Sequence, residues 1–176
     1  AQQPGSSLTD NEPTSVYLPL DQHTATQFDA VLTSFTELSA LILRTLHVDL
    51  RLHLLHGVSQ ALTHSYELGT LAPGHNAKPI DTPDPSILDL SAALSSYDAV
   101  ISEGLLQPQY AFLTRDLHVL GNNSFFSASM LGLVKGRIDD PGFARMQLNI
   151  LVLQQAVKNL DTADSSSLRK AGAFYA

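Results

Sequence analysis

Histidine is the residue type in this sequence whose spacing could support chemistry. His53 and His56 lie three positions apart, His64 follows two turns later, and His47 falls near the opposite side of a helix. Residues three apart share a helical face, so His53 and His56 could ligate zinc together with an acidic residue from another helix. The interpretation we favour is that these are surface or partly buried histidines on a helix covered by partner helices.

Sequence motifs of established enzyme classes are absent. There is no Gly-x-Ser-x-Gly elbow, no glycine-rich phosphate loop, no His-Glu-x-x-His, and no glutamate followed three residues later by histidine. The chain has no cysteine, which excludes disulfides, thiolate metal ligands and a cysteine nucleophile. Asp98 and Glu103 are expected on a solvated face rather than as a general acid or base. We therefore predict that the chain is not an enzyme and has no catalytic, cofactor-binding or metal-binding residues.

The charge distribution argues against nucleic acid as a partner. The net charge is -7, with 4 basic and 13 acidic residues over 1–134 and 6 basic and 4 acidic residues over 135–176. Nucleic-acid binding needs a basic surface that replaces phosphate counterions, and most of this chain would repel one. Lys135, Arg137 and Arg145 form a small basic group near a predicted helix junction. We interpret them as solvated charges near helix ends, with an anionic lipid or an acidic partner as the alternative.

Composition indicates a folded chain that is a piece of a longer one. Hydrophobic residues make up 44% and charged residues 15%, below the ~25% charged residues of ordinary soluble domains. No run approaches the ~20 consecutive apolar residues of a membrane span, and no secretory signal is present. The glycosylation sequon Asn122-Asn123-Ser124 is therefore interpreted as a chance match. The missing initiator Met, and a helical pattern that is cut off at residue 176, suggest a longer polypeptide.

A long helix is predicted over about residues 25–65. Its apolar stripe follows helical spacing through Phe28, Val31, Phe35, Leu38, Ile42 and Leu46. Thr24 or Thr26 could cap the first turn. Residues 46–54 alternate apolar and polar side chains, which taken alone predicts a strand. Because no turn residues bound this run, we expect a helix that is buried on several sides.

Three or four shorter helices are predicted at about 86–105, 108–135, 141–160 and 165–175. Asp84-Pro85 should start the first, Gly121-Asn122-Asn123 should kink or break the second, and Asp139 or Asp140 should cap the third. The fold class is all-α, an antiparallel, rod-like bundle in a single domain over 24–176, with a linker over 1–23 and a long loop over 67–85. Aromatic and methionine residues on the stripes are expected in the core: Phe28, Phe35, Tyr97, Tyr110, Phe126, Met130, Phe143 and Met146.

Three stretches of the sequence, in this order, resemble one known family. They are Leu43 to His53, Asp84-Pro85 through Leu113, and Asn149 to Gln155 followed by Leu160, Leu168, Arg169 and Phe174-Tyr175. Together they resemble the C-terminal helical region of exocyst complex component four, the Sec-eight family, over about residues 25–176. The Asn-Ile-x-Val-Leu-Gln-Gln run is the most specific of these features.

The resemblance implies a non-catalytic scaffold. The family belongs to a eukaryotic complex that tethers secretory vesicles to the plasma membrane before fusion, and its subunits are rods of stacked helical bundles. It implies other exocyst subunits as partners, small GTPases or trafficking proteins as further ones, and membrane contact mainly through other subunits. The expected location is cytoplasmic, at plasma-membrane sites of secretion. The alternatives are a helical adaptor of another trafficking tether, a peripheral membrane module, and a metal-binding helical-bundle enzyme.

Overall fold

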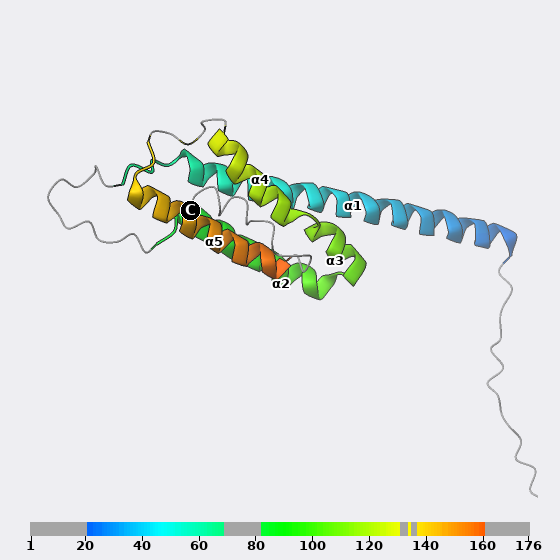
Figure 1. Ribbon diagram of the computed structural model, residues 1–176. Helices are drawn as coiled ribbons and strands as arrows, with labels where there is room; N and C mark the ends of the chain where they lie inside the picture. The colour runs from blue at the N-terminus through cyan, green and yellow to red at the C-terminus, as the bar shows by residue number, and fades with distance from the viewer. Residues whose placement is uncertain (1–20, 69–81, 131–133, 135–136, 161–176) are drawn as a thin grey trace, which may run out of the picture. The chain divides into compact units, whose positions relative to one another are not determined.

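The computed structural model describes residues 21–68, 82–130, 134 and 137–160, and all of its regular structure is helical (Figure 1). No strand occurs in these ranges, so the predicted all-α class is confirmed. The expected helix over 165–175, and most of the expected linker over 1–23 and loop over 67–85, lie outside the described residues. The helices are α1 (Gln22–Thr63), α2 (Pro85–Gly104), α3 (Gln107–Thr114), α4 (Leu117–Met130) and α5 (Asp140–Leu160).

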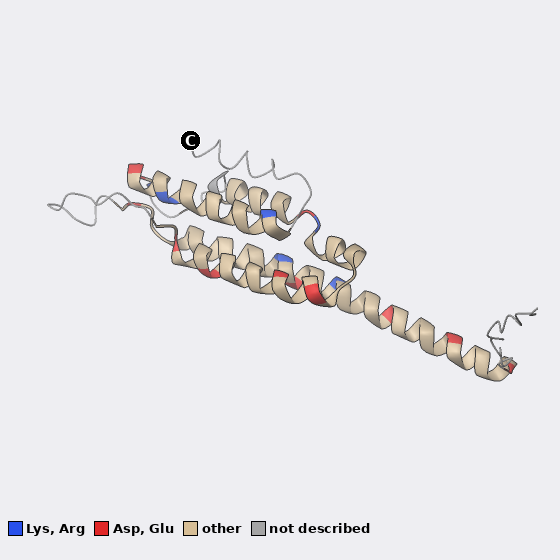
Figure 2. Ribbon diagram, turned by 90° about the horizontal axis from the view of Figure 1, so that it is seen from below, with Lys and Arg blue, Asp and Glu red and all other residues tan. Residues whose placement is uncertain are grey.

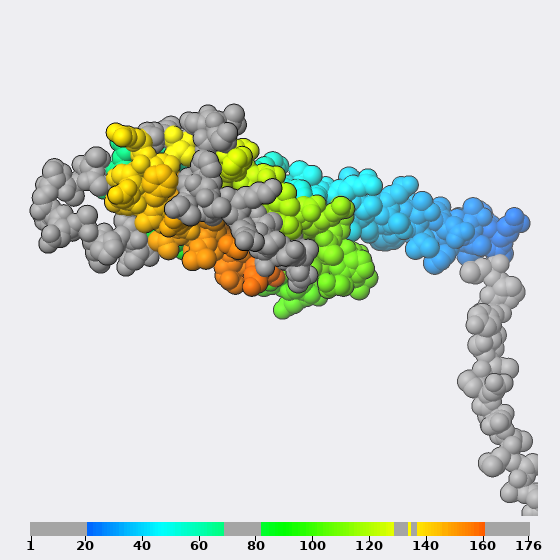
Figure 3. Space-filling view, viewed as in Figure 1, coloured from blue at the N-terminus to red at the C-terminus, as the bar shows by residue number. Residues whose placement is uncertain are grey.

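The chain divides into two compact units, Ala1–Ser39 and Ala40–Ala176. Helix α1 begins in the first unit and ends in the second. The described part of the first unit is one helical segment whose side chains are exposed at every position except Ala25, shown in blue in Figure 3. The buried core lies in the second unit. That residues 24–176 act as one domain stays a prediction.

The core of the second unit brings all five helices together. Helix α5 packs mainly against α2 and also contacts α4. Burying one Leu or Ile side chain contributes about 1.5–3 kcal/mol, so this cluster is the main source of stability. Its large, fully buried side chains are Tyr66, Phe125, Leu50, Leu54, Ile87, Leu94, Leu113, Leu117, Met146, Leu153 and Leu160.

Neighbouring helices do not all run antiparallel. His64, just after α1, bonds Asp84, just before α2, and further along the pair Tyr97 of α2 bonds Asp49 of α1. These two helices therefore run in opposite directions. Helices α2 and α5 run in the same direction: Asn149 bonds Asp84, whereas Tyr110 joins Asp98 of α2 to Leu160 at the end of α5. The expected antiparallel arrangement is therefore wrong for this pair. Helices α3 and α4 lie between them in sequence and return the chain to the starting end (Figure 1).

Residues 46–54 form part of α1, as predicted, and their period-two alternation has a structural origin. Leu50 and Leu54, four positions apart, are fully buried in the bundle. Val48 and Leu52, also four apart, are 53% and 59% exposed. Two apolar stripes on different sides of one helix therefore alternate in the sequence with polar residues, which gives the period-two pattern typical of a strand. The expectation that this helix is buried on several sides is wrong for the second stripe.

The helix expected at about 108–135 is divided into α3 and α4. The division lies before the predicted break at Gly121-Asn122-Asn123. Asp116 has φ 59, a left-handed conformation that ends α3 and lets α4 begin at Leu117. Gly121-Asn122-Asn123 continues α4 without interruption. Because α4 begins anew at Leu117, its buried face is shifted by one residue from the face predicted for an uninterrupted helix. Phe125 is fully buried, and Phe126, the predicted core residue, is 40% exposed.

Other predicted core aromatic residues are also exposed. Phe28 and Phe35 are 61% and 65% exposed because no described residue of the first unit packs on them. Phe143, in the first turn of α5, is 40% exposed. Met146 is buried as predicted, Tyr97 and Tyr110 are half-buried, and the side chain of Met130 lies outside the described residues.

Aspartates cap three of the helices. The Oδ1 of Asp21 accepts the backbone N–H of Thr24 at 2.8 Å, so Asp21 caps α1 in place of the predicted Thr24 or Thr26. This bond from the Thr24 N–H lowers the pKa of Asp21 because it favours the charged carboxylate. Asp139 accepts the Gly142 N–H at 2.8 Å and caps the start of α5, one of the two caps that were predicted. Asp84 starts α2 ahead of Pro85, as predicted.

Gly142 allows the start of α5 to touch the chain after α1. A Cβ at this position would lie 2.0 Å from the backbone oxygen of Tyr66. The same Tyr66 oxygen accepts the N–H of Asp139 at 3.3 Å. Only a residue without a side chain permits this close approach of two backbones.

An 18-residue window of α1 also has the hydropathy of a membrane helix. Its mean hydropathy is 1.2 and none of it is buried, and core helices of soluble proteins pass the same test. The exposed half of α1 contains Asp29 and Glu37, and an aspartate at the centre of a bilayer costs about 3 kcal/mol. Length and composition therefore do not by themselves identify a membrane span here.

Replacing Leu153 by Asp is expected to unfold the second unit. Leu153 is fully buried, and an unpaired buried charge costs about 3–5 kcal/mol. Leu151→Asp is the matched control on the same helix, since Leu151 is 61% exposed, and it should change stability by less than about 0.5 kcal/mol. Thermal unfolding followed by circular dichroism measures both. Equal melting points for L153D and wild type would contradict the assignment of this face to the core.

Gly142→Ala and Gly104→Ala should have opposite effects on stability. The first forces a Cβ against the Tyr66 carbonyl and should lower the unfolding free energy by about 1–3 kcal/mol. The second meets nothing within 4 Å and should raise it by up to about 1 kcal/mol through the unfolded state. Urea denaturation compares the two, and a Gly142→Ala variant as stable as wild type would refute the close approach.

Candidate functional site

A buried polar network connects the end of α1 and the residues just after it with the start of α2 and the middle of α5. At its centre is Asn149, which is 0% exposed. Its Oδ1 accepts the backbone N–H of Asp84 at 2.7 Å, and its Nδ2 donates to the Tyr66 hydroxyl at 3.0 Å. The Tyr66 hydroxyl in turn donates to the carbonyl of Ala61 at 3.1 Å. One amide therefore satisfies buried groups from two other segments, as buried polar atoms require.

Asp84 forms the second half of this network. Its Oδ1 accepts the Ser86 N–H at 2.9 Å, and its Oδ2 lies 2.7 Å from Nδ1 of His64. The Asp84 side chain is 2% exposed, whereas the His64 side chain is 50% exposed. Both carboxylate oxygens are thus engaged and shielded from solvent by the helix start and the imidazole. This geometry fixes a chain junction and leaves no room for a substrate at the carboxylate.

Tyrosine hydroxyls make two further links between helices. The Tyr97 hydroxyl on α2 donates to Oδ2 of Asp49 on α1 at 2.7 Å. This bond raises the pKa of the Tyr97 phenol because ionisation would remove the proton that the hydroxyl donates to Asp49. Partial burial and the negative charge of Asp49 raise the pKa further. The Tyr110 hydroxyl lies 2.7 Å from Oδ1 of Asp98 and 3.0 Å from the carbonyl oxygen of Leu160. Asp98 is thus a tyrosine partner, not the solvated residue that was predicted.

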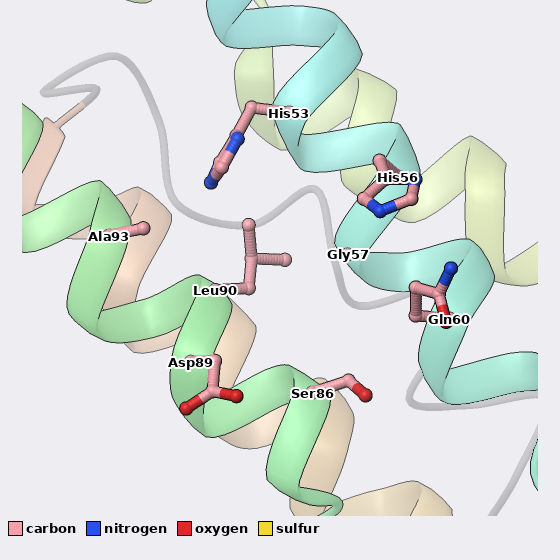
Figure 4. A pocket seen from close by; sticks show the side chains of 8 residues that line it. All are labelled: His53, His56, Gly57, Gln60, Ser86, Asp89, Leu90 and Ala93. Carbon is pink, nitrogen blue, oxygen red and sulfur yellow. The ribbon is translucent and has the colours of Figure 1, made fainter.

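His53 and His56 line an open hollow between α1 and α2 (Figure 4). The hollow has a volume of about 340 Å³, and the side chain of Leu90 rises between the two helices. Asp89, the carboxylate that lines this hollow, points away from both imidazoles (Figure 4). Because the donors do not converge, the hollow lacks the geometry of a zinc site.

The remaining histidines that were considered do not join that pair. His47 lies 3.2 Å from the carbonyl of Leu113 through Nδ1 and stacks on Phe112 with ring centroids 4.9 Å apart. His64 belongs to the Asp84 network. Over the described ranges, no group of three or more His, Asp or Glu side chains is close enough to hold a metal ion. Within the described residues, the histidines weighed as zinc ligands are thus not brought together with an acidic residue.

The predicted basic group of Lys135, Arg137 and Arg145 lies only partly within the described residues. Lys135 lies outside them, Arg137 is exposed, and Arg145 is half-buried on α5. The Arg137 backbone N–H donates to Oε1 of Glu67 at 2.8 Å, which places a carboxylate beside this segment. Figure 2 shows Lys and Arg as single residues among the helices of the second unit, without a basic patch in that view.

The sequon is unsuited to modification in the folded chain. Asn122, its acceptor residue, is 6% exposed and lies within α4. A glycan needs an exposed asparagine in a surface loop. Glu103 is exposed, as predicted.

The fold and the network define a class of protein: a helical bundle in which buried polar side chains join one helix to another. Comparison with known proteins identifies the particular kind. The chain is 35% identical over 147 residues to the probable exocyst complex component sec8 of Neurospora crassa. It is therefore homologous to a segment of the sec8 exocyst subunit, and the resemblance seen in the sequence is confirmed.

The match covers most of this chain but only a small part of the relative. It covers 83% of this chain and 12% of the relative, so the chain corresponds to a small part of a much longer protein. No protein-family model matches the chain. The most specific run of the resemblance begins at Asn149, the central residue of the buried network, whose burial and bonds were not predicted from the sequence. The sequence did contain one signal for this burial: a single Asn at a position of α5 where the helical spacing expects a core residue.

Asn149→Ala is expected to destabilise the second unit by about 2–3 kcal/mol. The change leaves the Asp84 N–H without its acceptor and opens a void, and a buried unsatisfied group costs about 1–3 kcal/mol. Asn159→Ala is the control: Asn159 is an exposed asparagine on the same helix and should change stability by less than about 0.5 kcal/mol. Urea denaturation measures both, and equal midpoints would show that the network contributes nothing.

Proposed function

We propose that this chain is a helical-bundle segment of a non-catalytic exocyst subunit, which acts in exocytosis by holding other proteins of the vesicle-tethering complex. The observation that carries the proposal is the 35% identity to the sec8 component over 83% of the chain. The structure supports it in a second way, because its buried polar residues are used to join helices. A scaffold needs such a fixed arrangement of surfaces and no reaction chamber.

The charges of the chain bear on which partners are proposed. With a net charge of -7, an anionic membrane surface would repel most of this chain. We therefore assign membrane contact to other subunits and propose other exocyst subunits as the direct partners, with small GTPases or trafficking proteins as further ones. The proposed location is the cytoplasmic side of plasma-membrane sites of secretion.

Affinity purification of the full-length polypeptide tests this function. The natural gene is tagged at its own locus, and co-purifying proteins are identified by mass spectrometry. The expected result is recovery of the other exocyst subunits in stoichiometric amounts. Recovery of the subunits of a different tethering complex, or of no tethering subunit, would refute the proposal.

A variant pair shows whether this segment takes part. Leu153→Asp disrupts the bundle core, whereas Leu151→Asp changes an exposed position of the same helix. At equal expression, L153D should lose partners that L151D retains. An identical set of partners for both variants would show that this bundle is not needed for assembly.

A further inference from the structure

One hydroxyl of the described chain combines an exposed position with a neighbour that an enzyme can select. Thr82-Pro83 is the single place in the 176 residues where Ser or Thr is followed by Pro. Thr82 is exposed and lies outside the helices, three residues before α2 begins at Pro85. Proline fixes its own φ, has no N–H, and disfavours helical backbone at the residue before it. Thr82 is therefore held out of the helix with a distinctive ring directly after it.

The other described Ser and Thr residues are less accessible to an enzyme. All except Ser65 and Thr82 lie in helices, where hydroxyls such as that of Ser34 donate to the carbonyl four residues earlier. Ser65 is followed by Tyr66, which is 0% exposed. A kinase must bring the acceptor oxygen into line with the γ-phosphorus of ATP, so the acceptor and its neighbours have to enter the enzyme's cleft. Thr82 meets this condition best.

The residue two positions after Thr82 controls how easily the segment can be bound. Asp84 is 1% exposed. Its N–H donates to Asn149 at 2.7 Å, and its carboxylate lies 2.7 Å from Nδ1 of His64. Residues 82–84 must therefore leave this junction before a kinase can surround Thr82. Folded proteins open locally in this way at a lower cost than global unfolding.

We infer that Thr82 is a phosphorylation site for a proline-directed protein kinase, which reaches it when residues 82–84 detach from Asn149. In the transfer, the Thr82 Oγ forms a bond to the γ-phosphorus of ATP, the bond from this phosphorus to the bridging oxygen breaks, and ADP leaves with its electron pair. The hydroxyl proton passes to the catalytic aspartate of the kinase. The phosphate adds a charge of about −1.5 to −2 close to the buried Asp84. This inference stands independently of the proposed function.

Phosphorylation of the purified full-length polypeptide tests the acceptor. An active mitogen-activated protein kinase, which selects proline after the acceptor, is supplied with Mg²⁺ and ATP, and phosphate on residue 82 is quantified by peptide mass spectrometry. Wild type and Thr82→Ser should both be phosphorylated, and Pro83→Ala should react at least tenfold more slowly. Misfolding would not explain that loss, because unfolding exposes the segment further. No phosphate on Thr82, or equal rates for wild type and P83A, overturns the inference.

A matched pair of asparagine variants tests the control by the junction. Asn149→Ala removes the acceptor of the Asp84 N–H, whereas Asn159→Ala changes an exposed position of the same helix. The rate at Thr82 should rise about tenfold in N149A and stay within twofold of wild type in N159A. His64→Ala removes the partner of the Asp84 carboxylate and should also raise the rate, which keeps the test valid if N149A does not fold. Equal rates in all four proteins would refute the detachment step.

The same peptide from cells tests whether the site is used. The full-length polypeptide is tagged at its own locus and isolated in the presence of phosphatase inhibitors. Phosphate on Thr82 should be found, and its amount should fall at least tenfold in the P83A variant. A peptide that carries no phosphate at Thr82, or the same amount in both proteins, would contradict the assignment of this site to a proline-directed kinase.

Discussion

The amide of Asn149 is the interaction on which the arrangement of the bundle depends. Apolar side chains drive helices together but set their relative positions only loosely, because the hydrophobic effect is non-directional. An amide with one acceptor and two donors requires partners at fixed places. Here these partners are the Asp84 N–H, at the start of α2, and the hydroxyl of Tyr66, after the end of α1. The core provides the stability and this network determines the register.

The fold could be predicted from the sequence wherever one helix presented one apolar face. The stripes of α2 and α5 and the Asp84-Pro85 start follow from spacing and capping chemistry alone. The break at Asp116 could not be predicted, because a left-handed aspartate depends on its tertiary setting and Gly121 offered a stronger local signal. The direction of α5 relative to α2 is likewise set by contacts between distant residues.

The polar network could not be predicted from the sequence for a related reason. Asp84 was recognised as a cap, since that role is local. Its further bond to His64, and its backbone bond to Asn149, join residues 20 and 65 positions apart in the chain. Histidines were considered as metal ligands because of their mutual spacing, whereas their actual partners are carbonyl and carboxylate groups from other elements.

The parallel course of α2 and α5 has a mechanical consequence. The bond between Asp84 and Asn149 joins the start of α2 to the middle of α5, and the Tyr110 hydroxyl bonds both Asp98, in the second half of α2, and Leu160, at the end of α5. Tension that drew these two helices past one another along their axes would load both attachments at once, in shear, instead of opening them one after the other. Side-by-side elements that share a load in this way resist sliding better than elements that peel apart from a single end.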